Sequence, residues 1–219
     1  MKIAILGAGS LGCAIGGLLA ESGNEVVLVN RNANFCAAVN TNGLTLNDGG
    51  TAGTTRIVLV QAIRDVAFQP VQKVLFDLII VLVKSKDTEA VVRSALPWMS
   101  DNTVVMSLQN GLGHEDIIAS LVGTERVLAG KTYVGGLMTS PGVVTIGTAG
   151  KETIIGELDG QITPRVVAIG KVFNDASLQT TVSNNIMGAM WDKILVNVAT
   201  GAITGITRLV YGLMYQVPE

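Results

Sequence analysis

A glycine-rich run near the start of the chain has residue types and spacing suited to holding phosphate groups. It follows the pattern G-x-G-x-x-G and consists of Gly7, Ala8, Gly9, Ser10, Leu11 and Gly12. Gly7 permits a tight turn, Gly9 lets the backbone approach a pyrophosphate, and Gly12 lets the next helix pack close to the strand. The helix would direct free N–H groups at the phosphates. The pattern indicates a dinucleotide site, with an unliganded glycine turn as the alternative.

The residues about twenty positions further along bear on which dinucleotide would bind. A protein that prefers NAD commonly carries Asp or Glu at the end of the second strand, beside the adenosine ribose. This chain has Asn30 and Arg31 there. No carboxylate at this place repels a 2′-phosphate, and a guanidinium group can grip one. We therefore expect NADP, held through Arg31; an ordinary solvated loop arginine is the alternative.

Polar residues also follow two apolar, strand-like runs. Lys84 comes directly after residues 78–83, and Asn110 follows the run that ends at Leu108. Ligands of open α/β sheets bind outside the carboxyl ends of the strands. We expect both side chains to face cofactor or substrate; a solvated lysine and an Asn-Gly turn are the alternatives.

A long helical pattern over residues 185–206 carries a further candidate pair. Lys193 and Asn197 are four residues apart and so share a helix face, which Gly201 continues. Lys193 lies among apolar residues, and a partly desolvated lysine has a lowered pKa and can donate a proton. A surface lysine with a snorkelling side chain is the alternative.

Strands and helices alternate in the part of the chain that must position these residues. A strand at residues 2–6, a helix at 10–22 and a strand at 25–29 make a βαβ-sized unit. Further strands are expected at residues 55–60, 77–83, 103–108, 142–147, 152–156 and 180–182, and further helices at 87–96 and 161–174. The segment 32–53 is rich in Asn, Gly and Thr and is expected to be looser.

This alternation predicts an α/β fold with a Rossmann-type, mainly parallel sheet and helices on both faces. The uninterrupted apolar run at 77–83 is typical of a parallel strand that is covered on both sides. We expect the sheet domain to occupy residues 1–183 and the start of an α-helical domain to occupy residues 184–219.

Composition excludes several classes of function. The 219 residues include 15 Lys and Arg against 17 Asp and Glu, a net charge of −2 that gives no basic surface for nucleic acid. The single histidine, His114, with Cys13 and Cys36, matches no metal-site spacing, so no metal is expected. Two unpaired thiols suit the cytoplasm. Residues 3–20 resemble an apolar leader, but glycines interrupt them, and we expect no membrane partner.

Taken in order, these stretches resemble the ketopantoate reductase family, the 2-dehydropantoate 2-reductases. The matching stretches are Ile3–Gly12, Asn30–Arg31, Val81–Lys84, Leu108–Gly113, Gly147–Leu158 and Met190–Asn197. The resemblance implies that residues 7–12 hold the dinucleotide and Arg31 its 2′-phosphate, with Lys84 and Asn110 beside the nicotinamide ribose. It also implies a cofactor contact at Gly136, a catalytic acid at Lys193, and substrate contacts from Asn110 and Asn197.

The reaction implied by the resemblance is reduction of a 2-oxo acid by NADPH, namely of 2-dehydropantoate to pantoate in pantothenate and coenzyme A biosynthesis. Two departures keep alternatives open. Gly201 stands where the family usually has a second asparagine. Most of the family's C-terminal helical domain, with a substrate-binding Ser and an assisting Glu, is expected to be missing. A dinucleotide-binding protein with little catalysis, or a reductase of another 2-oxo acid or an imine, are the alternatives. A second copy in a homodimer would cover the exposed face of the last helix.

Overall fold

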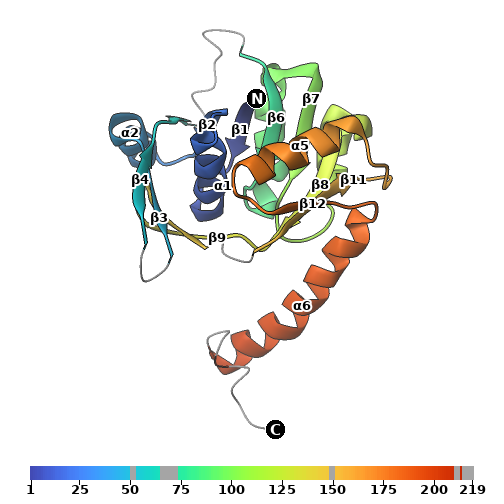
Figure 1. The fold of residues 1–219 in the computed structure, drawn as a ribbon. Coiled ribbons are helices and arrows are strands. Elements are labelled where there is room, and N and C mark those ends of the chain that lie inside the picture. The colour runs from blue at the N-terminus through green and yellow to red at the C-terminus, as the bar shows by residue number, and fades with distance from the viewer. Residues whose placement is uncertain (50–52, 65–73, 148–150, 210–212, 214–219) are drawn as a thin grey trace.

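An eight-stranded sheet forms the centre of the computed structural model, which describes residues 1–49, 53–64, 74–147, 151–209 and 213 (Figure 1). Its strand order is β12-β11-β8-β7-β6-β1-β2-β5. The strands are β1 (Lys2–Leu6), β2 (Glu25–Val29), β5 (Gln61–Ile63), β6 (Phe76–Val81), β7 (Met99–Ser107), β8 (Val127–Thr132), β11 (Thr153–Glu157) and β12 (Thr180–Val182). Neighbouring strands run parallel except β8 and β11, which are antiparallel. The predicted mainly parallel sheet is confirmed.

Helices cover both faces of this sheet, as predicted. They are α1 (Ser10–Glu21) and α5 (Pro164–Asp175) on one face, and α3 (Thr88–Ala95) and α4 (His114–Val122) on the other. Side chains of β1 alternate between the two cores: Ile3 and Ile5 join the first, and Ala4 and Leu6 the second. Because both faces are buried, the central strands are continuously apolar in sequence.

Within the described residues, three short 3₁₀ turns connect these elements to their neighbours. They are η2 (Ser85–Asp87), η3 (Leu96–Trp98) and η4 (Thr124–Arg126). The turn η3 contains Pro97, so α3 ends at Ala95, one residue earlier than the sequence predicts. A proline this close to the end of a helix cannot continue it, because its ring removes an N–H donor.

A second sheet corrects the expectation that residues 32–53 are loose. It has the order β4-β3-β10-β9, with strands β3 (Leu44–Asp48), β4 (Thr55–Val58), β9 (Gly135–Ser140) and β10 (Val143–Gly147). Helix α2 (Ala33–Asn42) precedes β3, and the side chain of Asn32 caps it by accepting the backbone N–H groups of Asn34 and Phe35. Only three residues of α2 are buried, so its apolar pattern was too sparse to read in the sequence.

The apolar run at residues 3–20 is part of the core. It forms β1 and α1, and Ile15 and Leu19 on α1 have no exposed surface. Helix α1 packs closely against β3 at Gly17, where a Cβ atom would lie 2.7 Å from the Leu46 side chain. The composition that resembled a leader therefore follows from burial of α1 between the two sheets.

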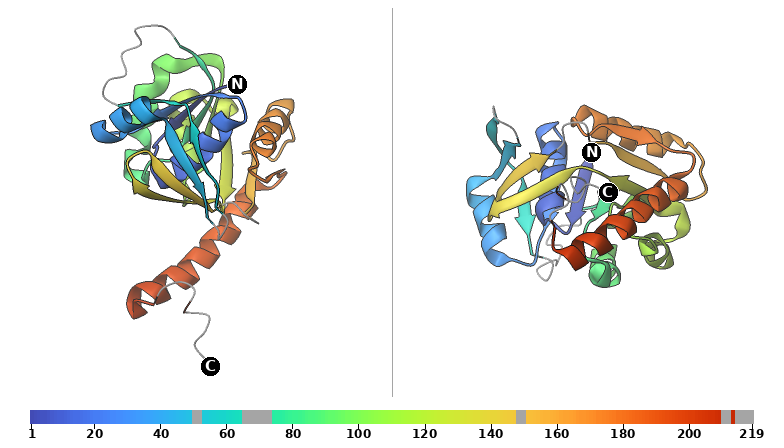
Figure 2. Two further views of the ribbon diagram at one scale, coloured as in Figure 1. Left: turned by 60° about the vertical axis from the view of Figure 1, so that its left-hand side comes forward. Right: turned by 90° about the horizontal axis from the view of Figure 1, so that it is seen from below.

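Helix α6 (Ile186–Thr207) extends away from the sheet domain (Figures 1 and 2). Asn185 caps it by accepting the backbone N–H of Gly188, and its first turns bury Ile186 and Met190 against Ala129. Its length and mean hydropathy of 1.2 would also suit a membrane span, with 17% of that window buried. Exposed apolar side chains follow from Trp191 to the end of the helix: Trp191, Leu195, Val196, Val198, Ile203 and Ile206. Residues 210–212 and 214–219 of the predicted helical domain lie outside the described residues.

Candidate functional site

The glycine turn between β1 and α1 has the geometry that its sequence pattern predicts. Gly7 has a φ of +105°, and a Cβ atom there would lie 2.6 Å from the backbone nitrogen of Val83. A Cβ atom on Gly12 would lie 2.4 Å from the carbonyl oxygen of Gly7. These two glycines are therefore required by the turn and by the close approach of α1 to it.

Gly9 differs from its neighbours, because a Cβ atom there would meet nothing within 4 Å. No side chain caps the N-terminus of α1, and its first turn holds no acidic residue. The hydroxyl of Ser10 instead accepts the backbone N–H of Met138 at 3.1 Å. The first N–H groups of a helix need partners from outside the helix. An open space in front of an uncapped helix end is suited to a phosphate group.

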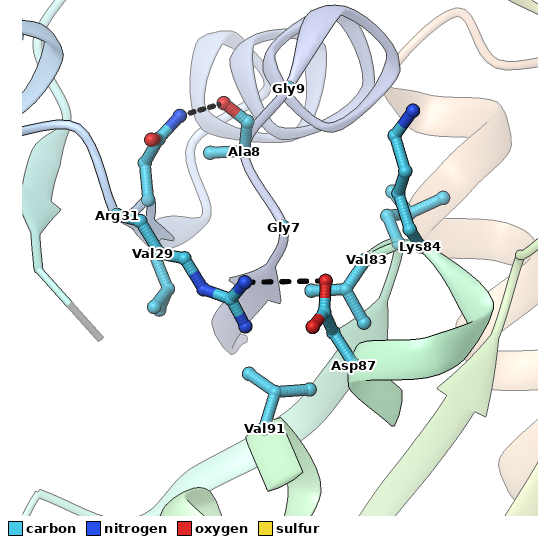
Figure 3. Close-up of a pocket in the computed structure, with 11 residues that line it drawn as sticks. Gly7, Ala8, Gly9, Val29, Arg31, Val83, Lys84, Asp87 and Val91 are labelled. Carbon is cyan, nitrogen blue, oxygen red and sulfur yellow. Dashed lines mark hydrogen bonds and ion pairs between the residues drawn. The ribbon is translucent and has the colours of Figure 1, made fainter. Parts of the chain in front are cut away.

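A pocket of about 270 Å³ opens beside this turn, at the carboxyl ends of β1, β2 and β6 (Figure 3). It is lined by Gly7, Ala8, Gly9, Val29, Asn30, Arg31, Leu82, Val83, Lys84, Asp87 and Val91. The Asn30 side chain donates to the carbonyl oxygen of Ala8 at 2.6 Å and accepts the backbone N–H of Asn32 at 2.8 Å. Asn30 therefore fixes the end of β2 against the glycine turn.

Arg31 faces a carboxylate across this pocket, which the sequence did not lead us to expect. Its Nη1 atom lies 3.3 Å from Oδ2 of Asp87, and Figure 3 shows the two side chains meeting above Val91. The end of β2 carries no acid, as the sequence shows, but the folded chain brings one to Arg31 from elsewhere. Asp87 comes from the connection between β6 and α3, more than fifty residues further along the chain than β2. Its position three residues after Lys84, at the same sheet edge, is the signal that could have located it.

The pocket continues toward the centre of the sheet edge. A second cavity of about 280 Å³ is lined by Leu11, Leu82, Val83, Lys84, Ser85, Leu108, Gln109 and Asn110. A third, small cavity is lined by Gln109, Asn110, Gly111, Gly130, Lys131, Met190, Lys193, Ile194 and Asn197. Each cavity shares residues with the next, Lys84 joining the first two and Asn110 the last two. The structure therefore brings the glycine turn, Arg31, Lys84, Asn110, Lys193 and Asn197 along one path.

Lys193 reaches from α6 to the sheet domain. Its ammonium group donates to Oδ1 of Asn110 and to the carbonyl oxygen of Thr132, each at 2.7 Å. An ammonium group has three N–H donors, and within the described residues no acceptor is found for the third. These contacts exclude the alternative of a snorkelling surface lysine.

The surroundings of Lys193 disfavour its charged form. Burial lowers the pKa of its amine below the ordinary 10.5, and the nearby charge of Lys131 lowers it further. No carboxylate lies within ion-pair distance of it among the described residues. The Tyr133 ring lies 5.4 Å from both lysine nitrogens. A desolvated ammonium of this kind releases its proton more readily than a surface lysine.

Two buried side chains, Gln109 and His114, hold the backbone beneath the site. The sequence alone did not identify them as site residues. Nε2 of Gln109 donates to the carbonyl oxygen of Val83 at 2.8 Å and to the hydroxyl of Thr88 at 2.9 Å. Nε2 of His114 lies 3.2 Å from the carbonyl oxygen of Asn110. Gln109 and His114 therefore fix the segments that follow β6 and β7. The position of Gln109 next to Asn110 was the available signal.

Three predicted site residues, Ser10, Gly12 and Gly136, line none of these cavities, and Gly136 is the one that lies outside the glycine turn. It belongs to β9, and a Cβ atom there would lie 2.4 Å from the carbonyl oxygen of Ser10. Its observed role is to let β9 cross the N-terminus of α1, and its contact with a cofactor stays a prediction. Asn197 lines the third cavity without a hydrogen bond to a described residue, so its contact with substrate also stays a prediction.

Comparisons with known proteins agree with this arrangement. The family model described as Ketopantoate reductase PanE/ApbA matches residues 3–160. The 2-dehydropantoate 2-reductase of Halobacterium salinarum is 35% identical over the whole chain, which covers 69% of that protein.

Solved structures of related dehydrogenases are also similar to this chain. The PanE/ApbA family ketopantoate reductase from Ralstonia eutropha JMP134 superposes with a TM-score of 0.83 at 32% identity, over 99% of this chain and 68% of that one. A D-mandelate dehydrogenase solved with NADH and anilino(oxo)acetate superposes with a TM-score of 0.86 at 27% identity, over 95% of this chain and 65% of that one. The chain thus spans about two thirds of the length of these relatives. It belongs to the ketopantoate reductase family.

Proposed function

We propose that this chain binds NADP(H) and reduces a 2-oxo acid, 2-dehydropantoate being the substrate that the family indicates. The observation that carries the proposal is the position of Lys193. Its partly desolvated ammonium group lies at one end of a path of cavities whose other end is the glycine turn. A proton donor and a dinucleotide site on one path are the two parts that ketone reduction requires.

The residues of the first two cavities fit a dinucleotide. The uncapped N-terminus of α1 and the open space at Gly9 would take the pyrophosphate. Arg31 would contact the 2′-phosphate, and Lys84 and Asn110 would lie beside the nicotinamide ribose. When bound, NADPH supplies a hydride. The protein's contribution is to hold NADPH and to orient its nicotinamide ring toward the substrate.

Lys193 would act on the ketone oxygen of the substrate. Two of its N–H groups are engaged by Asn110 and Thr132, which leaves the third to donate to that oxygen. As the ketone becomes an alcohol, negative charge develops on the oxygen, and the ammonium group stabilises this charge and donates the proton. Asn110 would serve twice, by positioning Lys193 and by offering its side-chain N–H groups to the substrate.

Two observations keep a second candidate function in view. Gly201 continues the face of α6 that carries Lys193 and Asn197, and a Cβ atom there would meet nothing within 4 Å. The substrate side is therefore less polar than the family pattern implies, which favours another 2-oxo acid. The chain also spans only about two thirds of its relatives' length, so binding of the dinucleotide with little turnover is the further alternative.

Turnover with different 2-oxo acids tests the proposal. NADPH oxidation would be followed at equal concentrations of 2-dehydropantoate, phenylglyoxylate and pyruvate. We expect oxidation to depend on a 2-oxo acid and to be fastest with 2-dehydropantoate. Faster oxidation with phenylglyoxylate would support the second substrate class. Tight NADPH binding without oxidation by any of the three would leave a binding protein and overturn the proposed reaction.

We place this activity in the cytoplasm. Cys13 and Cys36 are both buried and form no disulfide, which is the state that a reducing compartment maintains.

A further inference from the structure

An acid in the adenosine end of the pocket has no part in the function described so far. Asp87 stands where η2 ends and α3 begins, and its side chain is 22% exposed. Its Oδ2 atom lies 3.3 Å from Nη1 of Arg31, whose side chain is 60% exposed. Figure 3 shows the pair spanning the pocket below the backbone of Gly7. The residue assigned to the 2′-phosphate thus already has a negative partner.

The local structure gives this carboxylate no other task. Asp87 occupies the N-cap position of α3, where an aspartate commonly accepts a backbone N–H from the first turn. Its side chain makes no such hydrogen bond. The backbone N–H of Asp87 donates to the carbonyl oxygen of Lys84, which holds the turn closed without help from the carboxylate. The side chain is therefore directed to the pocket and not to its own helix.

We infer that Asp87 determines cofactor specificity by competing with the 2′-phosphate of NADPH for Arg31; this inference rests on the proposed function. The guanidinium group of Arg31 must leave the carboxylate, or share itself between two anions, when a 2′-phosphate arrives. NADH carries a hydroxyl group at that position, so it leaves the ion pair intact. Asp87 thus narrows the difference in affinity between NADPH and NADH and keeps the site open to both.

The expected size of the effect follows from the exposure of the pair. Ion pairs that are accessible to solvent contribute little, because water screens them and ordering two side chains is unfavourable. Removal of the carboxylate should therefore raise the ratio of NADPH to NADH affinity by about two- to fivefold. Arg31 and Asp87 both lie at the mouth of the pocket, so the fold should not depend on them.

The test is Asp87→Asn, which removes the charge and keeps the shape of the side chain. Dissociation constants for NADPH and NADH would be measured on the full chain by fluorescence titration, with circular dichroism to verify folding. We expect the ratio of the two affinities to shift toward NADPH, whereas general damage would weaken both dinucleotides alike. Glu89→Gln is the matched control, since Glu89 lies on the same helix, pairs with Arg93 and does not line the pocket.

The same substitution in an Arg31→Ala background separates competition from simple repulsion. If Asp87 acts through Arg31, Asp87→Asn should no longer change the ratio in this background. An unchanged ratio in the single variant, an equal shift in Glu89→Gln, or a full shift without Arg31 would each overturn the inference while leaving the proposed function in place. Failure of the unmutated chain to bind either dinucleotide would overturn both.

Discussion

The amine of Lys193 is the group on which the proposed chemistry depends at the scale of single residues. Burial and Lys131 hold its pKa below 10.5, so the ammonium form that donates the proton is lost at a lower pH than for a surface lysine. The rate of ketone reduction should therefore fall as the pH rises, with a midpoint below 10.5. A profile of kcat against pH on the alkaline side measures this midpoint.

Two substitutions of Lys193 control that measurement. Lys193→Ala should lower kcat by roughly 10²- to 10⁴-fold, the usual contribution of a general acid, with little change in NADPH affinity. Lys193→Arg keeps the charge, and because arginine stays protonated, it should move the alkaline fall to higher pH. An alkaline midpoint that is the same in Lys193→Arg would show that another group titrates.

Alanine substitutions at Gly9 and Gly12 should affect cofactor binding and folding in different ways. Gly9→Ala places a methyl group in open space, so the fold should survive while the methyl group blocks the dinucleotide. Gly12→Ala places a methyl group 2.4 Å from the carbonyl oxygen of Gly7, so the turn itself should be disrupted. Thermal unfolding and NADPH titration on both variants would separate the two effects. Wild-type NADPH affinity in a folded Gly9→Ala variant would mean that the turn faces away from the cofactor.

The exposed apolar face of helix α6 predicts that the chain forms a dimer. Leu195, Val198 and Ile206 expose between half and most of their side chains on its outer part. We propose that a second copy of the chain covers this face, since apolar side chains that lie exposed together on one helix favour association. Light scattering should then give the mass of a dimer, and a Leu195→Glu, Val198→Glu double variant should be monomeric.

A control for that experiment is available elsewhere on the surface. Leu59 is 87% exposed and lies between β4 and β5, away from α6. Leu59→Glu adds the same kind of charge and should leave the dimer intact. A monomer in the unmutated chain would contradict the proposal.

The elements also show what sequence reasoning can reach. Most strands of the central sheet and α1 were predictable because burial on both faces gives long apolar runs that short glycine turns interrupt. The strands β5 and β8 and the helix α4 were not predicted: β5 has only three residues, and Gly130 and Lys131 interrupt the apolar run of β8. In the second sheet, β4 and β10 were predicted as strands, but β3 and β9 were not, because they mix apolar and polar residues, and α2 was missed because few apolar residues anchor it.

Lys84 and Asn110 could be placed near the site because each directly follows a strand-like run, at the carboxyl edge of the sheet. Asp87 was missed because it follows β6 whereas its partner, Arg31, follows β2, and the sequence does not show directly that these two segments meet.

Binding should also be visible at the scale of the whole molecule. A dinucleotide that binds only the folded chain stabilises it, by about 2.7 kcal/mol when present at a hundred times its dissociation constant. For a chain of this size, such stabilisation raises Tm by roughly 5–10 °C. Thermal unfolding with and without NADPH measures the shift, which Gly9→Ala should abolish at the same concentration. An unchanged Tm for the unmutated chain would contradict dinucleotide binding.

The attachment of Lys193 to α6 makes the helix a lever. Lys193 lies about 10 Å along the helix axis from Ile186, whereas Thr207 lies about 31 Å from it. A swing about the first turn that moves the far end by about 3 Å would therefore move Lys193 by about 1 Å, enough to slow a reaction ~10²-fold. The acceptors at Asn110, which follows β7, and at Thr132, which ends β8, are held by the central sheet and would not follow this swing. A displacement of the outer end of the helix would therefore change the alignment of the proposed proton donor.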